Sequence, residues 1–102
     1  MGKVMLISGG SRGIGAATAR LAARDGWDVV VNYARNQDAA RSVVAEVEAA
    51  GRKAVAIQAD TGNPEDVARL FTESDAAFGR LDAFVNNAGI VIQGKIASHS
   101  NA

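Results

Sequence analysis

The chain has 102 residues, of which 48% are hydrophobic and 22% are charged, and its formal net charge is zero. This balance is typical of one small globular domain and argues against a general nucleic-acid or membrane-surface binder. The sequence contains no cysteine, and no apolar run approaches the roughly 20 residues of a membrane span. Disulfides and thiolate metal sites are therefore excluded, and we expect a cytoplasmic protein.

The first predicted strand spans residues 4–7, a short apolar run. Four glycines follow within seven residues, between positions 9 and 15, and a helix is predicted over 13–25. Gly26 has the place of a glycine that ends a helix. The residues that we expect on the buried face of this helix are Ile14, Ala17, Leu21 and Ala22.

Strand and helix patterns then continue to alternate. In chain order the predicted elements are a strand at 29–31, a helix at 36–50, a strand at 54–59, a helix at 64–78 and a strand at 81–86. The apolar stripe of the second helix consists of Ala40, Val43, Val44 and Val47. Asn63 followed by Pro64 is a strong helix start. Each connection is long enough for parallel pairing, so the pattern predicts an α/β fold of the order βαβαβαβ.

The glycine cluster lies where the first strand meets the first helix, at the carboxyl edge of the predicted sheet. There the helix N-terminus presents N–H groups, and glycine lets a phosphate approach the backbone. The spacing Gly9-x-x-x-Gly13-x-Gly15 differs from the commoner G-x-G-x-x-G, and alanines replace the lysine and hydroxyl residue of a P-loop. A tight turn without a ligand is the alternative. Within a βαβ unit, the cluster predicts a phosphate cradle to which Arg12 adds a charge.

The end of the second strand bears on the choice of dinucleotide. About 20 residues beyond the glycines, NAD-binding units usually place an acid on the adenosine ribose. Tyr33 has that position here, and the first acid after the strand is Asp38. A carboxylate would repel a 2′-phosphate, so its absence, with Arg35 and Arg12 in reach, favours NADP over NAD. The alternative is that Arg35 is a solvated loop charge.

Two motifs resemble those of the classical short-chain dehydrogenases/reductases. Residues 8–15, Ser-Gly-Gly-Ser-Arg-Gly-Ile-Gly, are similar to the family's T-G-x-x-x-G-x-G, with Ser8 keeping the hydroxyl of the threonine. Residues 86–89 are identical to its N-N-A-G motif. The resemblance covers residues 3 to about 91 and is nearest to ketoacyl-carrier-protein reductases and glucose-dehydrogenase-like members. It implies a Rossmann-type parallel sheet of order 3-2-1-4, truncated after the fourth strand, and hydride transfer between a nicotinamide and an alcohol or carbonyl.

The resemblance also implies a set of cofactor-binding residues. Those that would line the pyrophosphate and the adenosine ribose are Gly9, Ser11, Arg12, Gly13, Ile14 and Gly15. Tyr33 and Arg35 would flank the 2′ position, and Asp60 and Thr61 would meet the adenine. Those that would pass beneath the adenosine ribose are Asn87, Ala88 and Gly89. We accordingly divide the chain into a dinucleotide-binding unit at 1–91 and an irregular tail at 92–102.

The family's catalytic serine and its Tyr-x-x-x-Lys pair have no counterpart in this sequence. The single tyrosine is Tyr33, and Gln37 stands four residues later. His99, between two serines in the polar tail, has no acid nearby to orient it. We therefore predict no catalytic residues, no metal ligands and no turnover by this chain alone. A non-catalytic nucleotide-binding or assembly module is the alternative function.

The truncated sheet has a consequence for partners. We expect the helices at 13–25 and 36–50 to cover one face, and the helix at 64–78 to lie alone on the other. Strand 81–86 would be an unpaired edge with apolar surface beside it. We therefore predict self-association, or binding to a complementary chain, through this edge.

Overall fold

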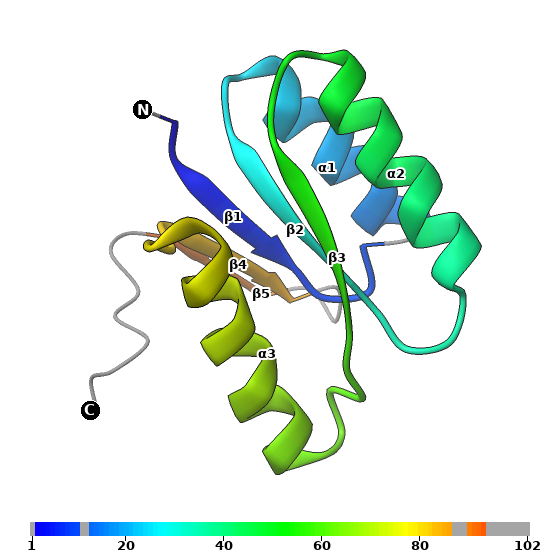
Figure 1. Ribbon diagram of the computed structural model, residues 1–102, viewed down its shortest axis with the longest axis vertical. Coiled ribbons are helices and arrows are strands. Elements are labelled where there is room, and N and C mark those ends of the chain that lie inside the picture. Colours follow the sequence, from blue (N-terminus) through cyan, green and yellow to red (C-terminus); the bar gives the residue numbers. More distant parts are fainter. Residues whose placement is uncertain (1, 11–12, 87–89, 94–102) are drawn as a thin grey trace.

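Strands and helices alternate along the chain, and the strands form one sheet (Figure 1). The computed structural model describes residues 2–10, 13–86 and 90–93. Its elements, in chain order, are β1 (Val4–Ile7), α1 (Gly13–Arg24), β2 (Asp28–Tyr33), α2 (Gln37–Ala49), β3 (Ala54–Gln58), α3 (Pro64–Phe78), β4 (Ala83–Asn86) and β5 (Ile90–Gln93). Helices α1 and α2 lie on one side of the sheet and α3 on the other, as predicted (Figure 1). Within these residues, no helix is long and apolar enough to cross a membrane.

The strand order is β3-β2-β1-β4-β5. β1 pairs in parallel with β2 and with β4, and β2 pairs in parallel with β3. The predicted four-stranded parallel arrangement of order 3-2-1-4 is therefore confirmed. Its central strand pairing aligns Met5 of β1 with Val29 of β2 and with Ala83 of β4.

The prediction that strand 81–86 is an unpaired edge was wrong. β4 lies between β1 and β5, and β5 pairs with it in antiparallel register, with Phe84 opposite Ile92. Residues 90–93 read Ile-Val-Ile-Gln, and β-branched residues favour strands. β5 thereby supplies hydrogen-bonding partners to the outer edge of β4. It also includes residues 92 and 93, which we had assigned to the irregular tail; residues 94–102 lie outside the described part.

Alternating side chains divide the core into two clusters on opposite faces of the sheet. On the side of α1 and α2, Ile7 and Val31 pack with alanines and valines of those helices. On the side of α3, Leu6 and Val30 pack with Leu70. Because both faces are covered at β2, its first five residues are all buried.

The prediction of which α1 residues are buried was wrong, because the helix turns a different face to the sheet. Ile14 and Leu21 are 78% and 62% exposed, and Ala17 is exposed as well; Ala22 alone of the predicted set is buried. The residues that α1 turns inward are Gly15, Ala16, Ala19, Ala22 and Ala23. These small residues let the helix approach the sheet closely, and the larger ones point outward. The stripe predicted for α2 is confirmed, with Val44 half-buried.

Local signals define both ends of α3 as expected. The Oδ1 atom of Asn63 accepts the backbone N–H groups of Glu65, at 2.9 Å, and Asp66, at 3.3 Å. Pro64 begins the helix, and Gly79 follows it with a φ of 74°, a left-handed conformation that favours glycine. The Asn63 cap fixes one end of the loop between β3 and α3, which carries Asp60 and Thr61 of the predicted site.

Candidate functional site

Most of the predicted site residues that the structure describes lie at one edge of the sheet. Parallel strands end at the same edge, and ligands of open α/β sheets bind outside those carboxyl ends. Gly9 follows the end of β1, Tyr33 is the last residue of β2, and Asp60 comes two residues after β3. The topology thus brings together residues that are more than 50 positions apart in the sequence.

The turn between β1 and α1 depends on glycine for two different reasons. Gly9 and Gly13 have φ angles of 63° and 62°, which side chains rarely tolerate. Gly15 lies against the turn, where an added Cβ would meet the carbonyl oxygen of Gly9 and stand 2.9 Å from the Cα of Gly10. The first turn of α1 therefore rests directly on the backbone of the preceding loop.

Hydrogen bonds show which amides of this turn are already engaged. The N–H of Gly9 donates to Oδ1 of Asn32 at 3.1 Å, and the N–H of Gly10 donates to the backbone carbonyl of Asn32 at 2.9 Å. The amide donors for an anion are therefore expected from the first turn of α1, which begins at Gly13. There the N–H groups have no partner within the helix and carry partial positive charge.

The ends of β2 and β3 form a second part of the site. Tyr33 is half-buried, and Arg35, Asp60 and Thr61 are exposed. The Nε2 atom of Gln58 donates to the carbonyl of Ala34 at 3.1 Å and ties the two loops together. Among the residues that the structure describes, no carboxylate forms an ion pair with Arg35.

Two aspartates, Asp60 in the loop and Asp66 in α3, hold the loop after β3. The N–H of Asp60 donates to Oδ2 of Asp66 at 2.8 Å, and Oδ1 of Asp60 accepts the N–H of Gly62 at 2.9 Å. The carboxylate of Asp60 thus stabilises its own turn while its side chain remains at the surface.

The two motifs of the sequence meet through Ser8. Its hydroxyl lies 3.3 Å from Oδ1 of Asn86 and 3.4 Å from the carbonyl of Val85, which joins the end of β1 to the end of β4. The hydroxyl that Ser8 shares with threonine thus has a structural role. The remaining predicted site residues lie outside the described part of the chain: Ser11, Arg12, Asn87, Ala88 and Gly89.

Asn32 was not among the predicted site residues, although it is buried and contacts the glycine turn. A signal for it was present, because an amide side chain directly follows three valines of a buried strand. Buried polar side chains are as a rule hydrogen-bonded, so such a residue points to a specific partner.

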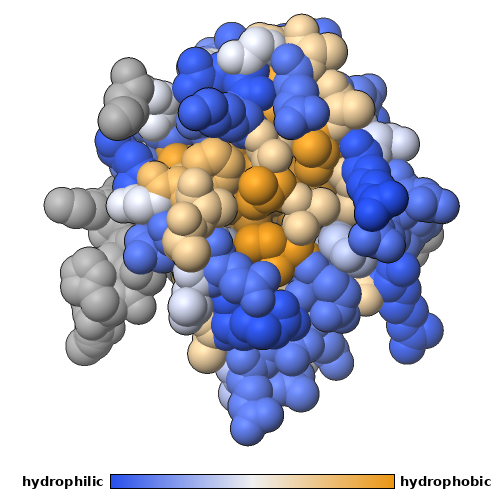
Figure 2. Space-filling view, in the orientation of Figure 1, coloured by the Kyte–Doolittle hydropathy of each residue, from blue (hydrophilic) through white to orange (hydrophobic). Residues whose placement is uncertain are grey.

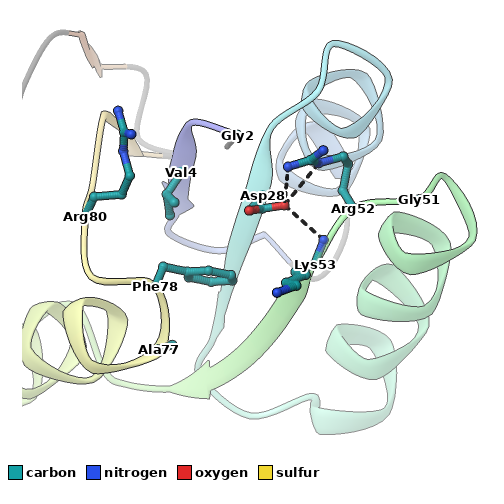
Figure 3. Close-up of a pocket in the computed structure, with 9 residues that line it drawn as sticks. All are labelled: Gly2, Val4, Asp28, Gly51, Arg52, Lys53, Ala77, Phe78 and Arg80. Carbon is teal, nitrogen blue, oxygen red and sulfur yellow. Dashed lines mark hydrogen bonds and ion pairs between the residues drawn. The ribbon is translucent and has the colours of Figure 1, made fainter.

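A cavity of about 390 Å³ lies at the opposite, amino edge of the sheet (Figure 3). The side chains of Asp28, Arg52 and Arg80, which line it, already have protein partners. Asp28 accepts hydrogen bonds at 3.0 Å from Nε of Arg52 and from the N–H of Lys53. The hydrogen bonds from Arg80 hold the pKa of Asp82 below its usual value, and Asp82 also accepts the N–H of Val4 at 2.9 Å. This network joins the beginnings of the strands.

The described residues contain no group of three His, Asp or Glu side chains arranged to hold a metal ion. At the carboxyl edge, the described part of the chain offers the first-turn amides of α1, which carry partial positive charge, and the exposed Arg35 that follows β2.

Comparison with known proteins identifies a family and several similar reductases. The model of the short chain dehydrogenase family matches residues 3–102. Versicolorin reductase 1 of Aspergillus parasiticus is 50% identical over 95 residues, which are 93% of this chain and 36% of that protein. The 3-oxoacyl-[acyl-carrier-protein] reductase of Synechocystis sp. is 49% identical over 88 residues, or 86% of this chain and 36% of that protein.

Solved structures extend the similarity to the fold. A short chain dehydrogenase from Burkholderia cenocepacia J2315, crystallised in complex with NADP, has a TM-score of 0.83 and 51% identity. The similarity covers 88% of this chain and 37% of that one. Acetoin dehydrogenase from Enterobacter cloacae has a TM-score of 0.82 and 41% identity, and covers 88% and 36% of the two chains. The chain thus spans little more than a third of the length of these relatives.

Proposed function

This chain belongs to the short-chain dehydrogenase family, and from that premise we propose that it is the NADP(H)-binding portion of an oxidoreductase. The reaction would transfer hydride between the nicotinamide and an alcohol or carbonyl carbon. The observation that carries the choice of NADP is the end of β2, where Tyr33 replaces the acid of NAD-binding units and Arg35 has no carboxylate partner among the described residues. The NADP complex of the relative from Burkholderia cenocepacia supports it.

Each part of the dinucleotide has a group suited to it. The first turn of α1 would bind the pyrophosphate, because its amides carry partial positive charge and Gly15 leaves room for the backbone. Arg12 would add a full charge there. Tyr33 and Arg35 would flank the 2′-phosphate, since a guanidinium forms strong charge-assisted hydrogen bonds with phosphate.

The adenosine would lie against the loop after β3. Asp60 and Thr61 would meet the adenine, and residues 87–89 would pass beneath the ribose. Gly9, Ser11, Gly13 and Ile14 would complete the wall along the pyrophosphate. When bound, the nicotinamide would supply or accept the hydride.

We further propose that the chemical step depends on residues outside these 102. The sequence contains no Tyr-x-x-x-Lys pair, and its single tyrosine belongs to the proposed adenosine side of the site. We therefore expect the chain to bind the dinucleotide without turning it over. We also propose a cytoplasmic location for the protein.

Association with a second copy, or with a complementary chain, is also part of this proposal. Among the elements that the structure describes, α3 alone covers its side of the sheet. Several hydrophobic side chains around it are only partly buried: Val55, Phe71, Phe78 and Phe84. Apolar surface of this kind is stabilised by a partner. Because β5 occupies the outer edge of β4, we assign the contact to this face rather than to the β4 edge.

Calorimetric titration with NADPH and NADH tests the cofactor assignment. We expect NADPH to bind more tightly than NADH, and Arg35→Ala to lower the NADPH affinity about tenfold with little effect on NADH. A charged hydrogen bond of about 1.5 kcal/mol corresponds to that factor. Arg24→Ala, at the far end of α1, is the matched control and should change neither affinity.

Two results would contradict the proposal. If neither dinucleotide binds the wild-type chain, the assignment of the site is wrong. If NADPH and NADH bind equally and Arg35→Ala has no effect, the site is a dinucleotide site without a preference for the 2′-phosphate.

A further inference from the structure

Asn32 lies at the centre of the carboxyl edge, where the ends of β1, β2 and β3 meet. Its side chain is buried, with 2% of the residue exposed, and it directly follows the three valines of β2. β2 is the strand between β1 and β3, so a side chain near its end can contact both neighbours (Figure 1).

The two ends of the Asn32 amide bond to different parts of the site. Oδ1 accepts the N–H of Gly9 at 3.1 Å, and Nδ2 donates to the carbonyls of Ile57 and Ala59, each at 3.2 Å. The acceptor end thus holds the glycine turn. The donor end holds the last residues before Asp60, which lies in the loop after β3.

The backbone of Asn32 strengthens the same connection. Its carbonyl accepts the N–H of Gly10 at 2.9 Å, so two successive amides of the turn bond to this one residue. The amide group is planar and of fixed size, and both of its ends are satisfied. It therefore sets the distance between the glycine turn and the end of β3.

We propose that Asn32 is a positioning residue. It holds the glycine turn and the loop after β3 at the separation that one dinucleotide spans. This inference rests on the proposed function, because the two loops have a common ligand only if the site binds a dinucleotide. Asn32 itself is buried beneath the site and acts through Gly9 and Ala59.

Neither Asp nor Ala meets both requirements at this position. Asp would keep an acceptor for Gly9 but turn a carboxylate oxygen toward the carbonyls of Ile57 and Ala59. Ala would leave all of these backbone groups without the side-chain partner, and unpaired buried polar groups are unfavourable.

The test compares a ligand that spans both loops with one that does not. Affinities for NADPH and for adenosine 2′-monophosphate, which lacks the pyrophosphate, are measured on wild type, Asn32→Ala and Asn32→Asp. We expect both variants to lower the NADPH affinity at least tenfold and the affinity for adenosine 2′-monophosphate less than threefold. Equal factors for the two ligands, or no change in either, would overturn the proposal.

Val31→Ala is the matched control, because it removes buried side-chain volume from the neighbouring position of the same strand. We expect it to lower the melting temperature without changing the ratio of the two affinities. A purely structural role for Asn32 would give the same result as this control.

Hydrogen exchange of the wild-type protein decides the matter if the Asn32 variants do not fold. The side-chain amide protons of Asn32 should become more protected when NADPH binds, and less so with adenosine 2′-monophosphate. Protection that NADPH leaves unchanged would overturn the proposal. Wild-type protein that binds no NADPH at all would instead refute the proposed function, so the two failures are distinguishable.

Discussion

Single residues of the glycine turn have separate physical tasks. Gly9 and Gly13 adopt left-handed backbone conformations, whereas Gly15 is required by contact, since the space of its missing side chain is filled by the backbone of residues 9 and 10. A close contact with backbone atoms cannot be relieved by a side-chain rotation. Substitution at Gly15 must therefore move either α1 or the turn.

Gly15→Ala is expected to lower the affinity for NADPH more than tenfold and to reduce the free energy of unfolding by about 1–3 kcal/mol. The added Cβ would displace the first turn of α1, whose amides we assign to the pyrophosphate. Titration with NADPH and urea denaturation measure the two effects.

Ala17→Gly is the control for this substitution, because Ala17 is exposed on the same helix and away from the turn. It should cost about 1 kcal/mol of helix stability and leave the affinity unchanged. If Gly15→Ala binds NADPH as tightly as wild type, the close packing of α1 on the turn is not what shapes the site.

At the scale of elements, the helices differ in how their position is determined. α2 and α3 follow their own sequence patterns, and α3 begins at a cap that is visible in the sequence. α1 instead follows the turn beneath Gly15, which is why Ile14 and Leu21 point outward although they have helical spacing. A tertiary contact thus overrides a pattern that is carried by four apolar residues.

Asn63→Ala is expected to lower the free energy of unfolding by about 1 kcal/mol, because the amides of Glu65 and Asp66 lose their cap. Urea denaturation followed by circular dichroism measures this change. Thr72→Ala, in the exposed middle of α3, should alter stability by less than about 0.5 kcal/mol. Equal effects of the two substitutions would show that the cap does not stabilise the helix.

At the scale of the whole molecule, the two faces of the sheet are unequally covered. In the described part of the chain, two helices pack on one face and one on the other. Figure 2 shows hydrophobic side chains gathered over the strands between α2 and α3, with hydrophilic residues around them. On the side of α3, Phe71 and Phe84 pack edge to face with ring centroids 5.5 Å apart, and both remain partly exposed. This face is the surface that we propose for contact with a partner.

Sedimentation is expected to show reversible association of the wild-type chain at micromolar concentration. Val55→Lys should shift the equilibrium toward monomer, because a charge on the α3 side of β3 opposes burial of that face. Leu21→Lys places the same charge on the outer surface of α1 and should leave association unchanged. A wild-type monomer, or dissociation by the Leu21 substitution instead, would contradict the assignment.

The sequence by itself determined the alternation of strands and helices and the ends of α3. These features depend on short-range patterns, such as buried valine runs and an asparagine cap, which act within a few residues. It also predicted that a ligand site lies at the carboxyl edge, since a glycine-rich turn after a parallel strand has that location in any sheet of this kind.

Only the tertiary structure decided the phase of α1, the pairing of β5 with β4 and the bonds of Asn32 to Gly9 and Ala59. The bonds of Asn32 join segments that lie apart along the chain, as Asn32 lies 23 residues from Gly9 and 27 from Ala59. The other two features join neighbouring segments, but they too depend on how one backbone lies against another. Hydrophobic periodicity predicts which side chains of one segment face the protein interior. It carries no information about which backbone atoms of another segment will be within hydrogen-bonding distance.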